Sequence, residues 1–436
     1  MGGDIPSSWW MCYGRAKLIS KILAVSFAII VPIIMAIGGY NGTVVTPLLL
    51  IGIIAICVIL VAVGKIKGNL IYFYIFGMSL GLLYQNTMMG VDVVGSDIHN
   101  EFYYAKLNVA QGWDYALMNT DNASFVIWFI APLLSKLLML DMVWVFKAVL
   151  PIFLAIVPLL LFSVFKRQFG EIRAFFATIF FMIIPVFSME MASIAKSMVA
   201  ELFFALMVWV MVSNWKWQYK TIGICVALMM QVICHYTVGV LAICFLLGMF
   251  IIRIVSNPLK WSLFSNRKVS LLAIAICLVV GICVFYSYHS LTANGSMWNR
   301  VGSLPSERLL LSKVGMPSTI IVRSSLVNAA VGLDFFDVPI EGKAFRIVQF
   351  LTQLMIIVGA IRLAFYDKFN ITAEFIGLIG ASWVLLFICI FVSGFANMLN
   401  MSRFYHFALF FLSPLFVIGC EAVGNIRLGN KGKALA

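Results

Sequence analysis

The sequence predicts an all-α protein that crosses a membrane many times. Of its 436 residues, 63% are hydrophobic and 11% are charged, whereas a soluble domain carries roughly 25% charged residues. The mean hydropathy is +1.06. The apolar residues form continuous runs close to the ~20 residues that a membrane-spanning helix needs, and not the ~10-residue alternating segments of a membrane β-barrel. These observations exclude a soluble enzyme, a disordered chain and a membrane β-barrel.

The apolar runs predict about twelve transmembrane helices. They are expected at 18–39, 45–63, 69–87, 142–165, 172–188, 197–213, 220–234, 236–254, 269–289, 345–363, 372–393 and 404–422. The segment 124–139 is also apolar, but we expect it to lie along the outer surface of the membrane, because a span there would invert every later loop. The stretch 220–254 is divided near His235, because one long helix would move the basic loop 256–268 to the outer side.

The distribution of charge predicts that both termini are cytoplasmic. Most of the 30 Lys and Arg residues fall on one side of the predicted spans, and an excess of basic residues marks the cytoplasmic side. This asymmetry explains the net charge of +13 without a nucleic-acid partner. The two long loops, 88–141 and 290–344, then face the outside, where we expect the function to reside. The nine cysteines show no CxxC spacing, so neither a disulfide framework nor a zinc site is predicted.

Three regions follow from this topology. Residues 1–68 form an N-terminal cytoplasmic segment and two additional transmembrane helices. Residues 69–255 form a middle region with the acidic external loop 88–141, and residues 256–436 form the C-terminal helices with the external loop 290–344. The chain has neither a Walker motif nor GxGxxG, so the sequence does not support ATP-driven transport.

The first external loop carries a group of polar residues directly after a predicted span. Asp97 and Glu101 are four residues apart, so on a helix they share one face, and His99 lies between them. Such groups could hold a divalent cation, or a carboxylate could remove the proton from an acceptor hydroxyl. Alternatively, Asp97 caps the helix and Glu101 is merely solvated. The following FYYAKLNVAQG predicts an amphipathic helix in the membrane interface.

The order of these residues resembles a known membrane superfamily. The segment GSDIHNEFYYAK at 95–106 is similar to the first luminal loop of GT-C glycosyltransferases, which include protein O-mannosyltransferases, oligosaccharyltransferase catalytic subunits and lipid A aminoarabinose transferases. Residues 124–170 resemble the surface helix, short turn and basic-ended span of that family, and SRFYHFALFFLSP at 402–414 resembles the start of its last helix. The chain is closer to prokaryotic membrane proteins of GT-C type than to any named enzyme.

The resemblance implies a GT-C-like fold, with residues 69–255 as the catalytic core and interfacial helices in the first external loop. It implies that Asp97 is catalytic, with Glu101 as the second candidate. Some members of the family complete a metal site with a second acid, so Asp97, Glu190 and His99 are candidate ligands of Mg²⁺ or Mn²⁺. The family's usual Thr-Asp is replaced here by Ala-Lys-Ser at 195–197, so metal-free catalysis is the alternative.

Several residues at the outer ends of the helices are candidates for binding the phosphate of a donor. Arg403 and His406 are three residues apart and share a face of the last span, and an arginine fork suits phosphate oxygens. The other candidates are Tyr405, His235 and Arg323. The alternatives are an interfacial arginine that extends to water and structural histidines. Lys196 could neutralise Glu201 or meet a lipid phosphate.

We therefore expect an integral-membrane glycosyltransferase of the cell membrane, with its active site on the extracytoplasmic face. It would transfer a sugar from a polyprenyl-phosphate donor to a glycan, lipid or protein acceptor. One alternative is a glycan polymerase or O-antigen-ligase-like enzyme, in which Arg403 is essential and Asp97 is not. The other is a transporter or flippase, although we find no paired repeat of the kind that transporters often show.

Overall fold

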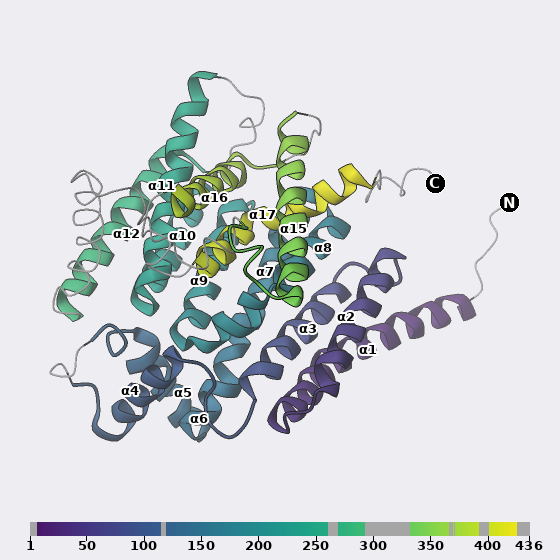
Figure 1. Ribbon diagram of the computed structural model, residues 1–436, viewed down its shortest axis with the longest axis horizontal. Helices are drawn as coiled ribbons and strands as arrows, with labels where there is room; N and C mark the ends of the chain where they lie inside the picture. The colour runs from purple at the N-terminus through teal and green to yellow at the C-terminus, as the bar shows by residue number, and fades with distance from the viewer. Residues whose placement is uncertain are drawn as a thin grey trace.

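The computed structural model describes residues 7–114, 119–259, 269–292, 332–365, 369, 371–391 and 401–424. Within these ranges every regular element is a helix and there is no strand (Figure 1). The predicted all-α class is therefore confirmed for the described part of the chain. Arg323 and most of the predicted loop 290–344 lie outside the described residues.

The helices follow the predicted apolar runs closely. They are α1 (Ser7–Tyr40), α2 (Val45–Ala62), α3 (Leu70–Thr87), α4 (Asp97–Gln111), α5 (Ala131–Leu138), α6 (Met142–Trp144), α7 (Leu150–Phe169), α8 (Glu171–Ile183), α9 (Ala195–Val212), α10 (Trp217–Cys234), α11 (Tyr236–Leu259), α12 (Leu271–Thr292), α15 (Ile340–Phe365), α16 (Ala373–Phe391) and α17 (Met401–Val423). Wider π-helical turns occur at Val126–Ile130, Val145–Val149 and Val186–Glu190.

Ten helices among the described residues are long and apolar enough to cross a membrane. An eleventh span results if α8 and the segment Val186–Ser193, which meet at a bend of 57°, count as one. The count is lower than the predicted twelve because α3 is not among the helices that are long and apolar enough to cross a membrane. This helix carries the polar residues Tyr84, Gln85 and Asn86 in its last turn. The chain is nevertheless a multi-pass helical membrane protein.

Two predictions about irregular segments agree with the structure. The helix pair α10 and α11 is interrupted at His235, whose backbone is extended (φ −150°, ψ 108°). The apolar segment Val126–Leu138 is helical but shorter than a span. Its tip is strongly exposed, with 93% of Met139 accessible. This short helix lies with α4 and α6 at one end of the bundle (Figure 1).

The core of the bundle consists of α7, α8, α9 and α17, which bury many phenylalanine side chains. Phe180 and Phe416 stack with ring centroids 3.9 Å apart. On one side α1 packs along α3, which packs on α7, and on the other α10, α11 and α12 form a group that contacts α9 and α16. Within a bilayer such contacts stabilise mainly through van der Waals packing, since lipid tails are as apolar as the side chains.

α15 and α17 cross with their backbones in contact. A Cβ atom added to Gly359 would lie 1.9 Å from the carbonyl oxygen of Leu415, and one added to Gly419 would lie 1.9 Å from that of Met355. Only glycine permits this approach, which is a common device for packing membrane helices. Towards the N-terminal ends of the two helices, an apolar cavity of about 660 Å³ opens between them and α16.

Candidate functional site

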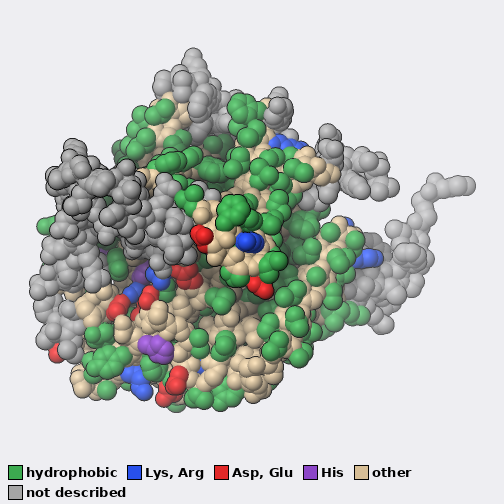
Figure 2. Space-filling model, in the orientation of Figure 1, with side chains coloured by type: hydrophobic (Ala, Val, Ile, Leu, Met, Phe, Trp, Pro, Cys, Tyr) green, Lys and Arg blue, Asp and Glu red, His purple; other side chains and the backbone are tan. Residues whose placement is uncertain are grey.

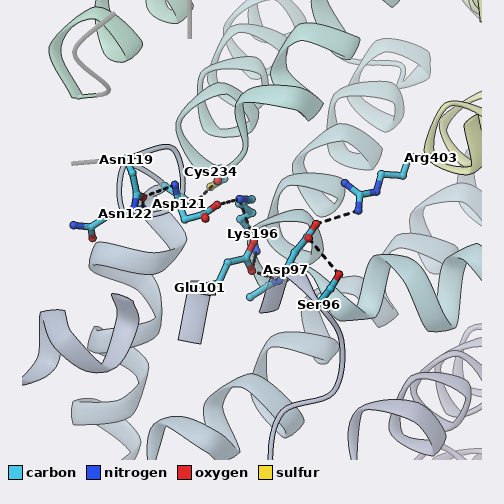
Figure 3. Close-up of polar contacts among 11 residues, drawn as sticks. Ser96, Asp97, Glu101, Asn119, Asp121, Asn122, Lys196, Cys234 and Arg403 are labelled. Carbon is cyan, nitrogen blue, oxygen red and sulfur yellow. Dashed lines mark hydrogen bonds and ion pairs between the residues drawn. The ribbon is translucent and has the colours of Figure 1, made fainter. Parts of the chain in front are cut away.

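Arg403 joins two carboxylates from distant parts of the chain. Its Nε donates to Glu190 at 2.9 Å, and its Nη2 donates to Asp97 at 3.1 Å (Figure 3 shows the latter). Asp97 begins α4, Glu190 ends the π-helical turn after α8, and Arg403 lies in the first turn of α17. The structure thus brings Arg403, a candidate phosphate-binding residue, to Asp97 and Glu190, which the sequence analysis had grouped as candidate metal ligands.

The backbone before Asp97 is shaped by a glycine. Gly95 has φ +131°, a conformation that residues with a side chain rarely adopt. A Cβ atom there would also lie 2.4 Å from the Cβ of Ser193. Gly95 therefore lets the chain pass close to the segment that carries Glu190. The Asp97 side chain remains 46% exposed, so an incoming substrate can reach it.

Glu101, one helical turn further on, occupies a different environment. It is fully buried, and its Oε2 accepts the backbone N–H of Ala195 at 2.6 Å and that of Lys196 at 3.4 Å. These N–H groups belong to the first turn of α9, where a helix favours negative charge. Burial raises the pKa of Glu101 to about 7, although the nearby Lys196 ammonium opposes the shift. Glu101 thus ties α4 to α9, and Asp97 is the accessible acid.

Lys196 is shared between two carboxylates, as Arg403 is. Its Nζ lies 3.2 Å from Glu101 and forms a short contact with Asp121 (Figure 3). Asp121 is held by a turn in which the Asn119 side chain accepts its backbone N–H at 2.9 Å. Asp121 is not among the residues expected from the sequence, although the Asn-Thr-Asp-Asn run around it is a turn signal. Of the two roles that the sequence left open for Lys196, pairing with Glu201 is not the one observed, because Glu201 binds a histidine instead.

That histidine is His406, which lies deeper in the bundle than predicted. Its ring is fully buried, with Nε2 2.9 Å from Glu201 and the ring centroid 4.9 Å from that of Phe181. The three-residue spacing does place His406 one turn below Arg403. At that depth it links α17 to α9 and does not line an open face, so the geometry gives no support to a phosphate-binding role.

His235 lies close to both shared cations. It is 5% exposed, and its Nδ1 has no hydrogen-bond partner among the described residues. Burial, assisted by the charges of Lys196 and Arg403, holds the pKa of His235 well below its usual range, so the ring is neutral. The preceding Cys234 carbonyl accepts a hydrogen bond from Ser124 at 2.5 Å, which anchors the break between α10 and α11 to the first loop (Figure 3).

The proposed metal ligands do not form a metal site. Among the described residues there is no group of three or more His, Cys, Asp or Glu side chains that could hold a metal ion. The Arg403 guanidinium already bridges Asp97 and Glu190. His99 is exposed and, two residues along α4, does not share a face with Asp97. The residues present do not fit a divalent cation, and no catalytic step is assigned to one.

The remaining candidate, Tyr405, lines the cavity between α15, α16 and α17. Ser402 and Tyr405, on either side of Arg403 in the sequence, are both part of its wall. The other walls are mostly apolar and include Ile356, Trp383 and Leu412. The cavity therefore adjoins the segment that carries Arg403. In the face that Figure 2 shows, most acidic side chains lie at the centre and lower left of the view, and hydrophobic and other surface covers most of the rest.

One family profile, described as "Predicted membrane protein (DUF2206)", matches residues 220–428. No curated protein matches the chain. The matched segment covers a little under half of the sequence and runs from α10 to α17. It contains His235 and Arg403, but Asp97, Glu101 and Glu190 lie before it. The comparison supports a membrane protein and names no activity.

Proposed function

We propose that the protein is an integral-membrane glycosyltransferase of GT-C type. It transfers a sugar from a polyprenyl-phosphate donor to an acceptor hydroxyl on the extracytoplasmic face. The observation that carries this proposal is the position of Asp97, an accessible carboxylate held against Arg403, whose neighbours in α17 line an apolar cavity. A base, a phosphate-binding cation and a place for a lipid tail are the three parts that such a reaction needs.

The reaction uses these parts as follows. The Asp97 carboxylate takes the proton of the acceptor hydroxyl, and the acceptor oxygen bonds to the anomeric carbon of the sugar. The bond from that carbon to the phosphate oxygen breaks, and its electron pair leaves with the lipid phosphate. Arg403 stabilises the phosphate through the planar fork of its N–H groups. Positioned general bases of this kind contribute about 10²–10⁴-fold to a rate.

Arg403 must change partners when a donor binds. Without a ligand its charge is shared by Asp97 and Glu190. A donor phosphate competes for the same N–H groups, and binding it releases a carboxylate from the guanidinium. If that carboxylate is Asp97, donor binding frees the base for the acceptor. Glu190 then keeps Arg403 in place through Nε.

The cavity suits the isoprenoid part of the donor. Its walls are apolar, and α15, one of its sides, is largely exposed along its length. A tail that moves from the bilayer into the cavity exchanges one apolar environment for another, so it gains little from the hydrophobic effect. The contribution of the cavity is to hold the phosphate at the level of Arg403.

The decisive experiment measures sugar transfer from a panel of polyprenyl-phosphate sugars by the reconstituted protein. Wild type is compared with Asp97→Asn and with Asp141→Asn, a matched control in which the aspartate only caps α6. We expect Asp97→Asn to bind the donor but to transfer about 10²–10⁴-fold more slowly, and Asp141→Asn to resemble wild type. Equal activity of Asp97→Asn would favour the polymerase-type mechanism. Movement of labelled donor across the bilayer without any transfer would favour a flippase.

A further inference from the structure

We infer that Lys147 is a positioning residue that holds the chain leading to Asp97. The ammonium group of Lys147 donates to the carbonyl oxygens of Met89, Gly90 and Asp92, at 2.9, 2.8 and 2.6 Å. The side chain is 1% exposed. An ammonium has three N–H donors, and all three are used on one short segment. The consequence for catalysis rests on the proposed function, but the positioning itself does not.

The backbone of Lys147 contacts the same part of the chain. In a regular helix its carbonyl would accept the N–H of the residue four positions later, but residue 151 is proline and has none. The Lys147 carbonyl accepts the hydroxyl of Thr87 at 2.9 Å. Lys147 therefore forms hydrogen bonds with residues 87–92 through both its backbone and its side chain. Lys147 lies in the π-helical turn Val145–Val149, and Pro151 follows in the first turn of α7.

The contacts of Lys147 restrict the position of Asp97, because only a short and well-packed segment separates Asp97 from residues 87–92. Between Asp92 and Asp97 the chain buries Val93, which is 5% exposed, and turns at Gly95 against Ser193. A segment held at 87–92, at Val93 and at Gly95 has little freedom to move its next residue. Precise placement matters, because a displacement of about 1 Å at a reacting group can lower a rate by about 10²-fold.

Alternative roles for Lys147 fit the contacts less well. A buried lysine without partners would be strongly destabilising, but here the three carbonyl oxygens satisfy the charge. A residue that only tied α3 to the turn before α7 would need no lysine side chain, because the Thr87 contact is made by its backbone carbonyl. The three side-chain bonds all go beyond the end of α3, to the turn that leads to Asp97.

The test uses Lys147→Met, which keeps the length of the side chain and removes its donors. Its control is Lys220→Met, because Lys220 is an equally buried lysine that donates to the Met211 carbonyl at 3.1 Å, outside the acidic loop. The first measurement is amide hydrogen exchange of the peptide 88–97 in the reconstituted protein. We expect exchange to accelerate about 10-fold or more in Lys147→Met and to stay at the wild-type rate in Lys220→Met.

The second measurement is the rate of sugar transfer. We expect kcat to fall about 10²-fold in Lys147→Met with KM for the donor within about twofold of wild type, and Lys147→Arg to recover part of kcat because it keeps charged donors. Thr87→Val, which removes only the backbone contact, serves if Lys147→Met does not fold, and it should accelerate exchange of the same peptide.

The outcomes separate the two proposals. Unchanged exchange in 88–97 overturns the positioning role, whatever the activity. Faster exchange with an unchanged kcat overturns its link to Asp97. If wild type transfers no sugar from any donor but exchange accelerates as expected, the proposed function fails and the positioning of this segment by Lys147 stands.

Discussion

The two ends of the helix bundle pair their charges differently. At the end away from Asp97, each cation has its own carboxylate: Arg253 lies 3.1 Å from Glu374, and Arg173 lies 2.7 Å from Glu421. At the Asp97 end, Arg346 also pairs with a single carboxylate, Asp334, but one guanidinium is shared by Asp97 and Glu190, and one ammonium is shared by Glu101 and Asp121.

This difference separates charges that hold helices together from charges that can act on a ligand. A cation with a single buried carboxylate cannot leave it without stranding that charge, whereas a shared cation can release one carboxylate and keep the other. The following variants break or sharpen the comparison, from the largest expected effect to the smallest.

The largest effect on stability is expected at the end of the bundle away from Asp97. Replacing Arg253 by methionine leaves the fully buried Glu374 without this cation, and breaking a buried pair in this way costs about 3–5 kcal/mol. The free energy of unfolding in detergent should fall by that amount, while the transfer rate per folded molecule stays unchanged. Lys166→Met is the control, because its pair with Glu171 is about one-third exposed and should contribute only about 0–1 kcal/mol. Equal losses in the two variants would contradict the expectation.

At the Asp97 end of the bundle, the expected loss is in activity. Arg403→Gln removes the cation that meets the leaving phosphate in the proposed reaction, and we expect loss of such a group to lower kcat by about 10²–10³-fold. Arg173→Gln, at the other end, is the matched control and should keep its kcat. A variant Arg403→Gln that unfolds as easily as Arg253→Met and still transfers sugar would place Arg403 among the structural pairs.

The raised pKa of Glu101, at the Asp97 end of the bundle, makes the free energy of unfolding depend on pH. Because burial raises the pKa of Glu101 from 4.5 to about 7, the folded protein favours the protonated form. The corresponding stability is complete below about pH 4.5 and is lost as the pH rises through 7, on the order of 3 kcal/mol in total. Unfolding measured across this range should show the decline in wild type and in Asp141→Asn. Glu101→Gln should lack this decline, and a decline of wild-type size in that variant would assign it to another group.

The smallest effect concerns α17, which connects the two ends. Gly419→Ala would place a Cβ atom 1.9 Å from the Met355 carbonyl oxygen and push α15 away, at a cost of about 1–3 kcal/mol. Gly52→Ala in α2 meets nothing within 4 Å and should cause no such loss. Thermal unfolding of both variants compares them. A neutral Gly419→Ala would mean that the crossing adjusts easily.

Much of this arrangement could be predicted from the sequence. Apolar runs mark the helices because each must fill the thickness of a bilayer, and the basic loop 256–268 was enough to divide the helix pair at His235. Topology also placed Asp97, Glu190 and Arg403 on one side of the membrane. Their direct contact could not be read from the sequence, because it depends on how α4, the turn after α8 and α17 pack together.

The contacts that the sequence did not predict share one physical cause, which is that they depend on how distant helices pack. Helical spacing puts Glu101 on the same face as Asp97 but does not say which of the two meets the first turn of α9. It puts His406 on the same side as Arg403 but not at the same depth. The metal hypothesis considered only the acids and His99, whereas the charge that bridges Asp97 and Glu190 belongs to an arginine about two hundred residues later than Glu190 in the chain.

The polar end of α3 has a consequence for how the protein is made. The hydroxyl groups of Tyr84 and Thr87 and the amide of Asn86 bind carbonyl groups 64, 60 and 102 residues later in the chain. When α3 leaves the ribosome, none of these acceptors has been synthesised. α1, which packs along α3, is already present. When α3 enters the bilayer it can therefore pack only against earlier helices such as α1. Its polar contacts form later, once α7 and α8 have been synthesised.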